Sequence, residues 1–177
     1  MRHLFRIAPV LALGIAASAC VPSVAPPRVT PSPAPTPAAR PLPAPAPVLK
    51  GDWRDWPLTP GDWRYQDGAR ESVARYGERG GETVFAIRCD KKRRQISLSR
   101  PGAAPRSLPM TIRTSSQTRT LTAQPDGREM VVTLAAQDRL LDAMGFSRGR
   151  FIVEMPPMQT LVISSWAEVL RVTEDCR

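Results

Sequence analysis

The chain has 177 residues, a formal net charge of +9, 20 Pro, 3 Cys and one His. That histidine, His3, lies in a segment that we interpret as a cleaved leader, so the mature chain has no Ser-His-Asp or Cys-His mechanism and no His-ligated metal site. The composition excludes most hydrolase and metalloenzyme designs, and we expect neither a metal nor a cofactor.

Residues 1–19 have the pattern of an export signal. Arg2 and Arg6 form a positive n-region, residues 7–15 are apolar, and residues 17–19 are the small residues of a cleavage site. The apolar stretch is shorter than the roughly 20 residues that a membrane span needs. We therefore expect a signal peptide and an exported protein.

Cys20 follows the leader directly, and residues 17–20 resemble a bacterial lipobox, whose cysteine carries a diacylglyceryl group. Ala17 stands where lipoboxes more often have Leu. Cleavage of the same bond by an ordinary signal peptidase would instead give a soluble periplasmic or secreted protein with a free thiol. The cysteine count favours lipidation, because it leaves Cys89 and Cys176 as one pair. We expect a lipid anchor in the envelope, facing the periplasm.

Residues 20–50 are expected to form a disordered tether. Eleven of residues 21–50 are Pro, and none is acidic. Proline fixes φ and removes a hydrogen-bond donor, which excludes helices and sheet ladders. At about 3.1 Å per residue, such a spacer reaches roughly 90 Å when fully extended. It is either a stalk that holds a domain away from a membrane or an unselected linker.

The remaining residues, 51–177, carry a formal charge of +4. Nucleic-acid binding requires basic residues gathered on one face of a domain. The mixed charge and the export signal together predict no nucleic-acid partner.

Short alternating segments separated by turn-forming residues predict a mainly β domain over residues 51–177. We expect six to eight short antiparallel strands, drawn from residues 63–65, 72–76, 83–89, 95–100, 108–112, 118–122, 130–134, 151–155 and 160–163. Pro125, Asp126 and Gly127 predict a turn. In the segment 83–89, the residues Phe85, Ile87 and Cys89 share one face.

Two segments predict short helices. Residues 137–144 place apolar side chains at helical spacing and end at Gly145. Ser165, with Glu168 three residues later, is a capping-box pattern that predicts a terminal helix from residue 166 to about residue 172. The expected fold is α+β: a small antiparallel β-sandwich or barrel with one or two short helices.

Cys89 ends a predicted strand, and Cys176 lies beside the C-terminus. A disulfide between them would connect the last helix to the sheet. Closing the loop of 86 intervening residues stabilises the fold by about 4 kcal/mol in the chain-entropy model. The alternative is two free buried thiols. The spacing does not match the Cys-x-x-Cys pattern of a redox pair.

A Gly-Asp-Trp-Arg motif occurs twice, with a further tryptophan between the copies. Trp53, Trp56 and Trp63 would form an aromatic surface for sugars, or else cover the edge of a small core. Arg148 and Arg150 flank a glycine and would bind a carboxylate or phosphate, or else belong to a plain turn before a strand.

Two carboxylate pairs are candidates for acid–base chemistry on glycosides. Asp138 and Asp142 lie four residues apart on a predicted helix, and Glu174 and Asp175 precede Cys176. The alternative for both pairs is solvated surface charge or charge at a helix end.

The leader ending at Cys20, the Pro/Ala-rich tether and three motifs of the domain (residues 88–90, 146–151 and 174–177) resemble uncharacterised envelope proteins of GC-rich alphaproteobacteria. This resemblance covers the whole chain and implies no known activity. A second resemblance is to lipoprotein inhibitors of lysozyme, which are small disulfide-bonded β-barrels. Their inhibitory loop is of the Ser-Gly-x-x-Tyr type, and the nearest match here, residues 116–119, lacks both the Gly and the Tyr.

We therefore expect a non-catalytic binding or structural module that is tethered in the cell envelope. Its expected partners are the membrane, through Cys20, and peptidoglycan or an envelope protein. The alternatives are a lysozyme-inhibitor-like lipoprotein and a carboxylate-based enzyme acting on cell-wall glycan.

Overall fold

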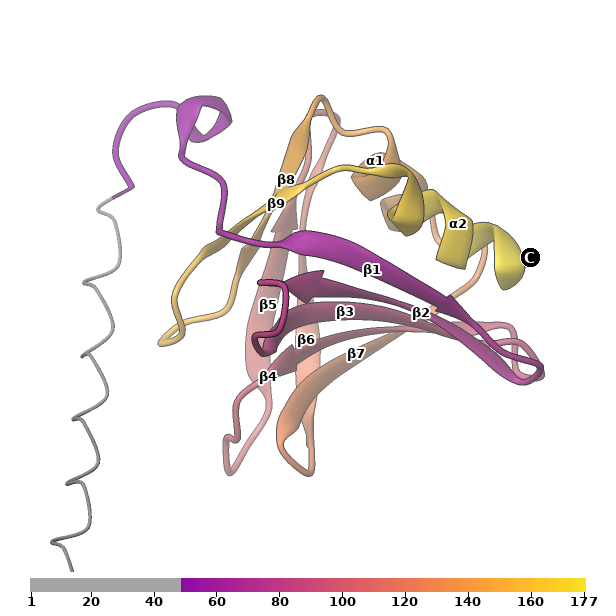
Figure 1. Ribbon diagram of the computed structural model, residues 1–177. Coiled ribbons are helices and arrows are strands. Elements are labelled where there is room, and N and C mark those ends of the chain that lie inside the picture. The colour runs from indigo at the N-terminus through magenta and orange to yellow at the C-terminus, as the bar shows by residue number, and fades with distance from the viewer. Residues whose placement is uncertain (1–48) are drawn as a thin grey trace, which may run out of the picture. The chain divides into compact units, whose positions relative to one another are not determined.

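A computed structural model describes residues 49–177, and the expected signal peptide, Cys20 and residues 20–48 of the expected tether lie outside them. The described part contains nine strands and two short α-helices (Figure 1). The strands are β1 (Asp62–Asp67), β2 (Glu71–Gly77), β3 (Thr83–Asp90), β4 (Gln95–Pro101), β5 (Leu108–Arg113), β6 (Thr118–Asp126), β7 (Glu129–Ala135), β8 (Arg150–Glu154) and β9 (Leu161–Ser164). The helices are α1 (Arg139–Gly145) and α2 (Ala167–Asp175), and a 3-10 turn, η1 (Trp53–Asp55), precedes β1. The predicted mainly β fold is confirmed.

All neighbouring strands are antiparallel and form one sheet in the order β1-β2-β3-β4-β7-β6-β5-β8-β9. The long strand β6 joins the two halves, because residues 118–123 pair with β5 and residues 124–126 pair with β7. In Figure 1, β5 and β6 run across the direction of β1 to β3. The sheet therefore turns back on itself along β6.

Hydrogen bonds also connect the two edges of the sheet. The backbone N–H of Thr59 donates to the carbonyl of Val162 at 2.9 Å, and the N–H of Val162 donates to the Thr59 hydroxyl at 2.9 Å. The Trp63 indole N–H donates to the carbonyl of Ser164 at 2.8 Å. These bonds join the β1 side to β9, so the single sheet closes into a barrel-like shell, one of the two architectures that the sequence left open.

The core lies inside this shell. Phe85, Ile87 and Cys89 are fully buried, as their shared face predicts. The ring of Phe85 contacts Trp63 and Phe151 edge to face, with centroid distances of 6.4 and 6.1 Å. Aromatic contacts therefore cross the interior from β1 through β3 to β8.

Two details of the expected strands differ in the structure. There are nine strands rather than six to eight, since both short segments at the chain ends pair as edge strands. β6 also continues through the expected turn, because Pro125 pairs with Met130 of β7. The reversal falls instead at Gly127, whose φ of +61° suits a residue without a side chain.

The predicted capping box at Ser165 is wrong. α2 begins at Ala167, and its N-cap, Trp166, makes no side-chain cap hydrogen bond. The Ser165 hydroxyl lies 2.6 Å from the carbonyl of Met144 and 2.9 Å from that of Gly145. The hydroxyl therefore donates to carbonyls at the C-terminal end of α1 and does not cap α2. It can reach them because α1 packs beside the segment that leads into α2.

Arg100 is a charged side chain on the inner face of β4, and it is only 6% exposed. Its guanidinium donates to the carbonyl of Gln159, while Nη1 has no partner and no carboxylate of residues 49–177 forms an ion pair with it. Burial lowers the pKa of Arg100 well below its ordinary value, to about 10. Because folding disfavours the charged form, Arg100 destabilises the folded state at every pH below about 10.

We expect Arg100→Met to raise the free energy of unfolding by about 2 kcal/mol, because methionine fills a similar volume without a buried charge. Urea unfolding at neutral pH measures this change. Arg100→Lys keeps the charge and should give no gain. A less stable methionine variant would show that the bond to the Gln159 carbonyl outweighs the cost of burial.

No helix within residues 49–177 is long and apolar enough to cross a membrane.

Candidate functional site

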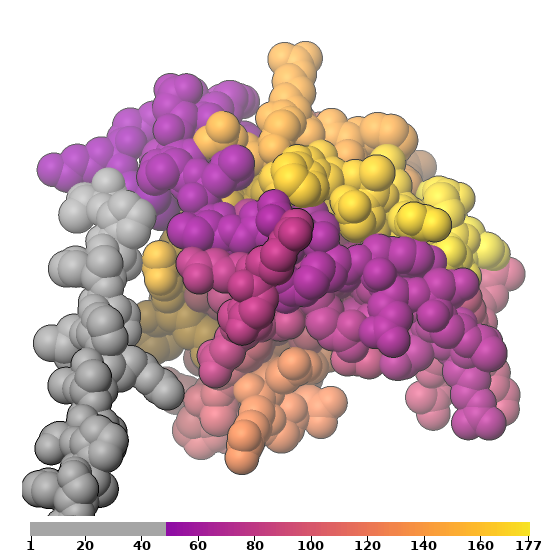
Figure 2. Space-filling model, in the orientation of Figure 1, coloured from indigo at the N-terminus to yellow at the C-terminus, as the bar shows by residue number. Residues whose placement is uncertain are grey.

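Trp53 and Trp56 lie on the short turn that precedes β1. The Asp52 carboxylate accepts a hydrogen bond from the backbone N–H of Arg54 at 2.9 Å and so begins η1, and the N–H of Trp56 donates to the carbonyl of Trp53 at 3.3 Å. Residues three apart on a 3-10 turn lie one above the other. Both indoles are half-buried, and in the space-filling view the indigo segment that holds η1 stands out from the strands (Figure 2).

Arg150 connects this turn to the sheet. Its guanidinium donates to the backbone carbonyl of Trp56, and its backbone pairs with Ser164 across β8 and β9. The Ser164 carbonyl accepts the Trp63 indole N–H. The structure thus brings Trp56, Arg150 and Trp63 into one neighbourhood.

Trp63, however, belongs to the core and not to the exposed surface. It is 6% exposed, and its ring contacts Tyr76 edge to face at a centroid distance of 5.3 Å. Its alternation with outward residues on β1 directs it into the barrel. The exposed aromatic surface is therefore formed by Trp53 and Trp56, without Trp63.

The segment from Ser147 to Arg150 is a tight turn fixed to a neighbouring loop. The Ser147 hydroxyl accepts the N–H of Ser115 at 3.0 Å, and the Ser115 hydroxyl accepts the N–H of Arg148 at 3.2 Å. Gly149, with a φ of +77°, makes the reversal. The backbone donors of this turn are thus partly used within the protein, while the Arg148 side chain is exposed.

Both carboxylate pairs are engaged within the fold. Asp138 accepts the N–H of Leu140 at the start of α1 and two bonds from Arg119, at 2.7 and 2.9 Å. Asp142 accepts a bond from Arg177 at 2.7 Å. Glu174 also pairs with Arg177, and Asp175 accepts the hydroxyl of Tyr65. These contacts support the helix-end interpretation of the four carboxylates.

Burial by itself raises the pKa of the Asp138 carboxyl. The hydrogen bonds from Arg119 and from the N–H of Leu140 together outweigh burial, so the pKa lies below its usual value of 3.8. Since the folded pKa is lowered, the stabilisation is present above pH 3.8 and is lost as the pH falls through the folded pKa.

We expect Asp138→Asn to cost about 1 kcal/mol at neutral pH, because Asn keeps the helix cap but not the charge paired with Arg119. Asp138→Ala should cost about 1 kcal/mol more through loss of the cap. Urea unfolding at neutral pH and at about pH 2 measures both. A penalty for Asn that persists unchanged at the lower pH would contradict the ion-pair origin.

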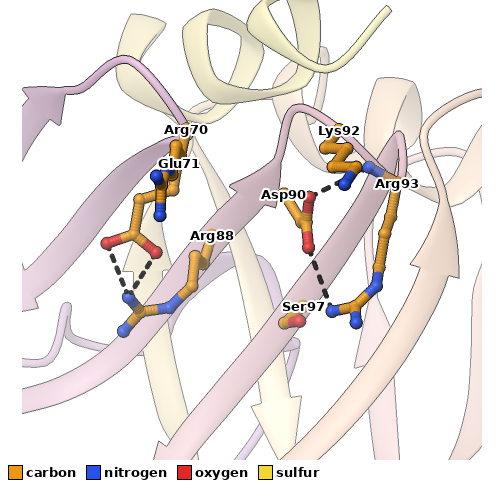
Figure 3. A pocket seen from close by; sticks show the side chains of 7 residues that line it. All are labelled: Arg70, Glu71, Arg88, Asp90, Lys92, Arg93 and Ser97. Carbon is orange, nitrogen blue, oxygen red and sulfur yellow. Dashed lines mark hydrogen bonds and ion pairs between the residues drawn. The ribbon is translucent and has the colours of Figure 1, made fainter.

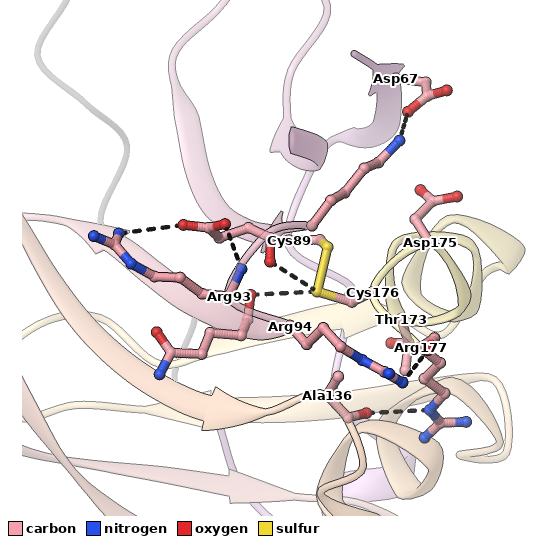
Figure 4. The surroundings of a disulfide bond; sticks show 12 residues. Asp67, Cys89, Arg93, Arg94, Ala136, Thr173, Asp175, Cys176 and Arg177 are labelled. Atoms are coloured by element: carbon pink, nitrogen blue, oxygen red, sulfur yellow. Dashed lines mark hydrogen bonds and ion pairs between the residues drawn. A yellow bond between two sulfur atoms is a disulfide. The ribbon is translucent and has the colours of Figure 1, made fainter. Parts of the chain in front are cut away.

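Cys89 and Cys176 form the predicted disulfide, with a Cα–Cα distance of 5.5 Å (Figure 4). Cys89 lies on β3, and Cys176 is the C-cap of α2, so the bond connects the last helix to the sheet. Val169 and Val172 of α2 are fully buried beside it. Such a bond is typical of proteins in oxidising, exported compartments.

We expect the double variant Cys89→Ala/Cys176→Ala to lose about 4 kcal/mol of unfolding free energy, because the bond restricts the unfolded chain. Urea unfolding of the wild type with and without a reductant gives the comparison. The reductant should destabilise the wild type and leave the double variant unaffected. Equal stability of the two proteins under oxidising conditions would contradict a structural role.

A charged groove on the outer face of β2 to β4 was not anticipated from the sequence (Figure 3). It has a volume of about 980 Å³ and is lined by Arg70, Glu71, Arg88, Asp90, Lys92, Arg93 and Ser97. Its residues are far apart in the chain but adjacent in register, since Glu71 faces Asp90 and Arg88 faces Ser97. The outward polar positions that alternate with the core residues of these strands were the signal for it.

No protein-family model matches this sequence, and no curated protein matches it either.

Proposed function

We propose that this protein is a non-catalytic binding module, held in the bacterial envelope by a lipid on Cys20, whose ligand is peptidoglycan glycan bound at Trp53 and Trp56. The observation that carries the proposal is the presentation of two half-exposed indoles on one short turn, connected to the sheet by Arg150.

The chemistry of this turn suits a sugar ligand. An indole offers a broad apolar face, against which the C–H face of a sugar ring packs. The Arg54 guanidinium stacks over the Trp53 ring at 5.0 Å, and the Trp56 indole N–H donates to the carbonyl of Lys50 at 3.1 Å. These contacts order the two rings before a ligand arrives, which reduces the entropy cost of binding.

Three further features support a position in the envelope. The leader has the pattern of an export signal, Cys20 follows it as in a lipobox, and the Cys89–Cys176 bond fits an oxidising compartment. The Pro-rich segment between Cys20 and the domain would supply the reach from a membrane to the cell wall.

We expect the full chain to co-sediment with purified peptidoglycan sacculi at about 0.15 M salt and to remain bound at several-fold higher salt, because stacking on aromatic rings is not screened. Trp53→Ala/Trp56→Ala should abolish this binding. The matched control is Phe146→Ala/Trp166→Ala, which removes two aromatic side chains that are 73% and 49% exposed elsewhere on the domain.

Binding that disappears at high salt would show that charge attraction alone holds the protein on the sacculi, and would contradict stacking on the two tryptophans. Equal loss in both double variants would contradict a site at Trp53 and Trp56. No binding by the wild type at either salt would overturn peptidoglycan as the ligand and leave an envelope protein as the partner to identify by crosslinking.

A further inference from the structure

We propose that the groove on the outer face of β2 to β4 is a second binding site, which takes an extended acidic segment of a partner protein. This site is independent of the Trp53–Trp56 surface and goes beyond the glycan-binding function.

The groove has the size and position for a polypeptide segment. Its volume of about 980 Å³ is at the upper end of the range for ligand pockets, roughly 300–1,000 Å³, and is far more than one small anion fills. Ser97 is the only small side chain among its lining residues, and it lies across from Arg88 in register and between Arg88 and Arg93 in Figure 3. A flat bilayer does not enter such a hollow, whereas a single extended chain does.

The charges of the groove are not balanced. Arg88 binds both carboxylate oxygens of Glu71, at 3.2 and 3.1 Å, and Arg93 pairs with Asp90 at 3.2 Å. Arg70 and Lys92 form no ion pair with any carboxylate of residues 49–177. The lining therefore keeps a net charge of +2, which is complementary to a segment with several carboxylates.

The two cations without ion pairs lie on neighbouring turns. Arg70 lies between β1 and β2, and Lys92 lies in the turn between β3 and β4. The N–H of Lys91 donates to the carbonyl of Arg70 at 3.1 Å, which fixes the two turns against each other. Two acidic residues of a partner segment can thus each meet one of these cations at the end of the groove where the two turns lie (Figure 3).

The existing ion pairs also allow exchange. The Arg93 and Glu71 side chains are 74% and 52% exposed, and exposed pairs of this kind contribute only about 0–1 kcal/mol. A carboxylate from a partner can replace Glu71 at Arg88, or Asp90 at Arg93, at little cost. The groove therefore offers four cationic positions along the path of an acidic chain.

The test uses the full chain and a peptide of eight glutamates, labelled for fluorescence anisotropy, at about 0.15 M salt, where charges farther apart than about 8 Å are largely screened. Arg70→Gln/Lys92→Gln should raise the Kd by about tenfold or more, because charge-assisted contacts are lost. The matched control is Arg79→Gln/Arg128→Gln, which removes the same charge at two exposed positions outside the groove. It should change the Kd by less than about twofold, as distant charges are largely screened.

A third variant changes affinity in the opposite direction. Glu71→Gln releases Arg88 from its partner and should lower the Kd by about threefold, a result that loss of folding does not produce. Trp53→Ala/Trp56→Ala should leave peptide binding unchanged, so failure of the glycan-binding proposal is distinguishable from failure of this one.

Several outcomes would overturn the proposal. If the groove variant and its charge-matched control weaken peptide binding equally, the peptide is attracted to net charge alone and not to the groove. Equal binding of an eight-glutamine peptide would show that carboxylates are not recognised. Absence of octaglutamate binding, with phosphatidylglycerol vesicles bound through Arg70 and Lys92, would assign the cations to a membrane surface.

Discussion

Closure of the sheet between β1 and β9 is the constraint on which the other features of this domain depend. The Trp63 indole makes this contact from the inside, since its ring packs on Tyr76 and Phe85 while its N–H reaches the carbonyl of Ser164. Without this contact and the Thr59–Val162 bonds, one edge of a nine-stranded sheet would expose unpaired backbone groups and the aromatic core. Closure also fixes the position of the η1 turn, because Arg150, next to Ser164 in register, binds the carbonyl of Trp56.

The two helices cover one end of the sheet. α2 lies along the ends of β1 to β3, buries Val169 and Val172, and is connected to β3 by the disulfide (Figures 1 and 4). α1 packs against α2 so closely that a side chain at Gly145 would overlap Leu170. This end is therefore covered, and the two surfaces that we propose for partners lie elsewhere, on the outer face of β2 to β4 and on the turn before β1. One presents charge and the other presents aromatic rings, so the domain has two chemically distinct surfaces.

Much of the fold was predictable because alternation is a local property of the chain. Phe85, Ile87 and Cys89 share a face in any strand, and export with two remaining cysteines predicts their pairing. The site was less predictable. Trp53 and Trp63 occupy the same position of a repeated four-residue motif, and only the pairing of β1 with β2 directs Trp63 into the core. Ser165 matches a helix-capping pattern, yet its hydroxyl serves the carbonyls of α1, a contact between segments 20 residues apart.

Local features of the chain were enough to predict the β-rich class, the faces of the strands and the approximate positions of both helices, because periodicity and turn residues act over short distances. The cysteine pair followed from the cysteine count. The tertiary structure decided which edges meet, which tryptophan is buried, and that Arg70, Arg88 and Lys92 line one groove. It also decided that Arg100 is buried with only the Gln159 carbonyl as a partner. These features depend on strand order and register, and residues far apart in the chain become neighbours only when the sheet pairs and closes.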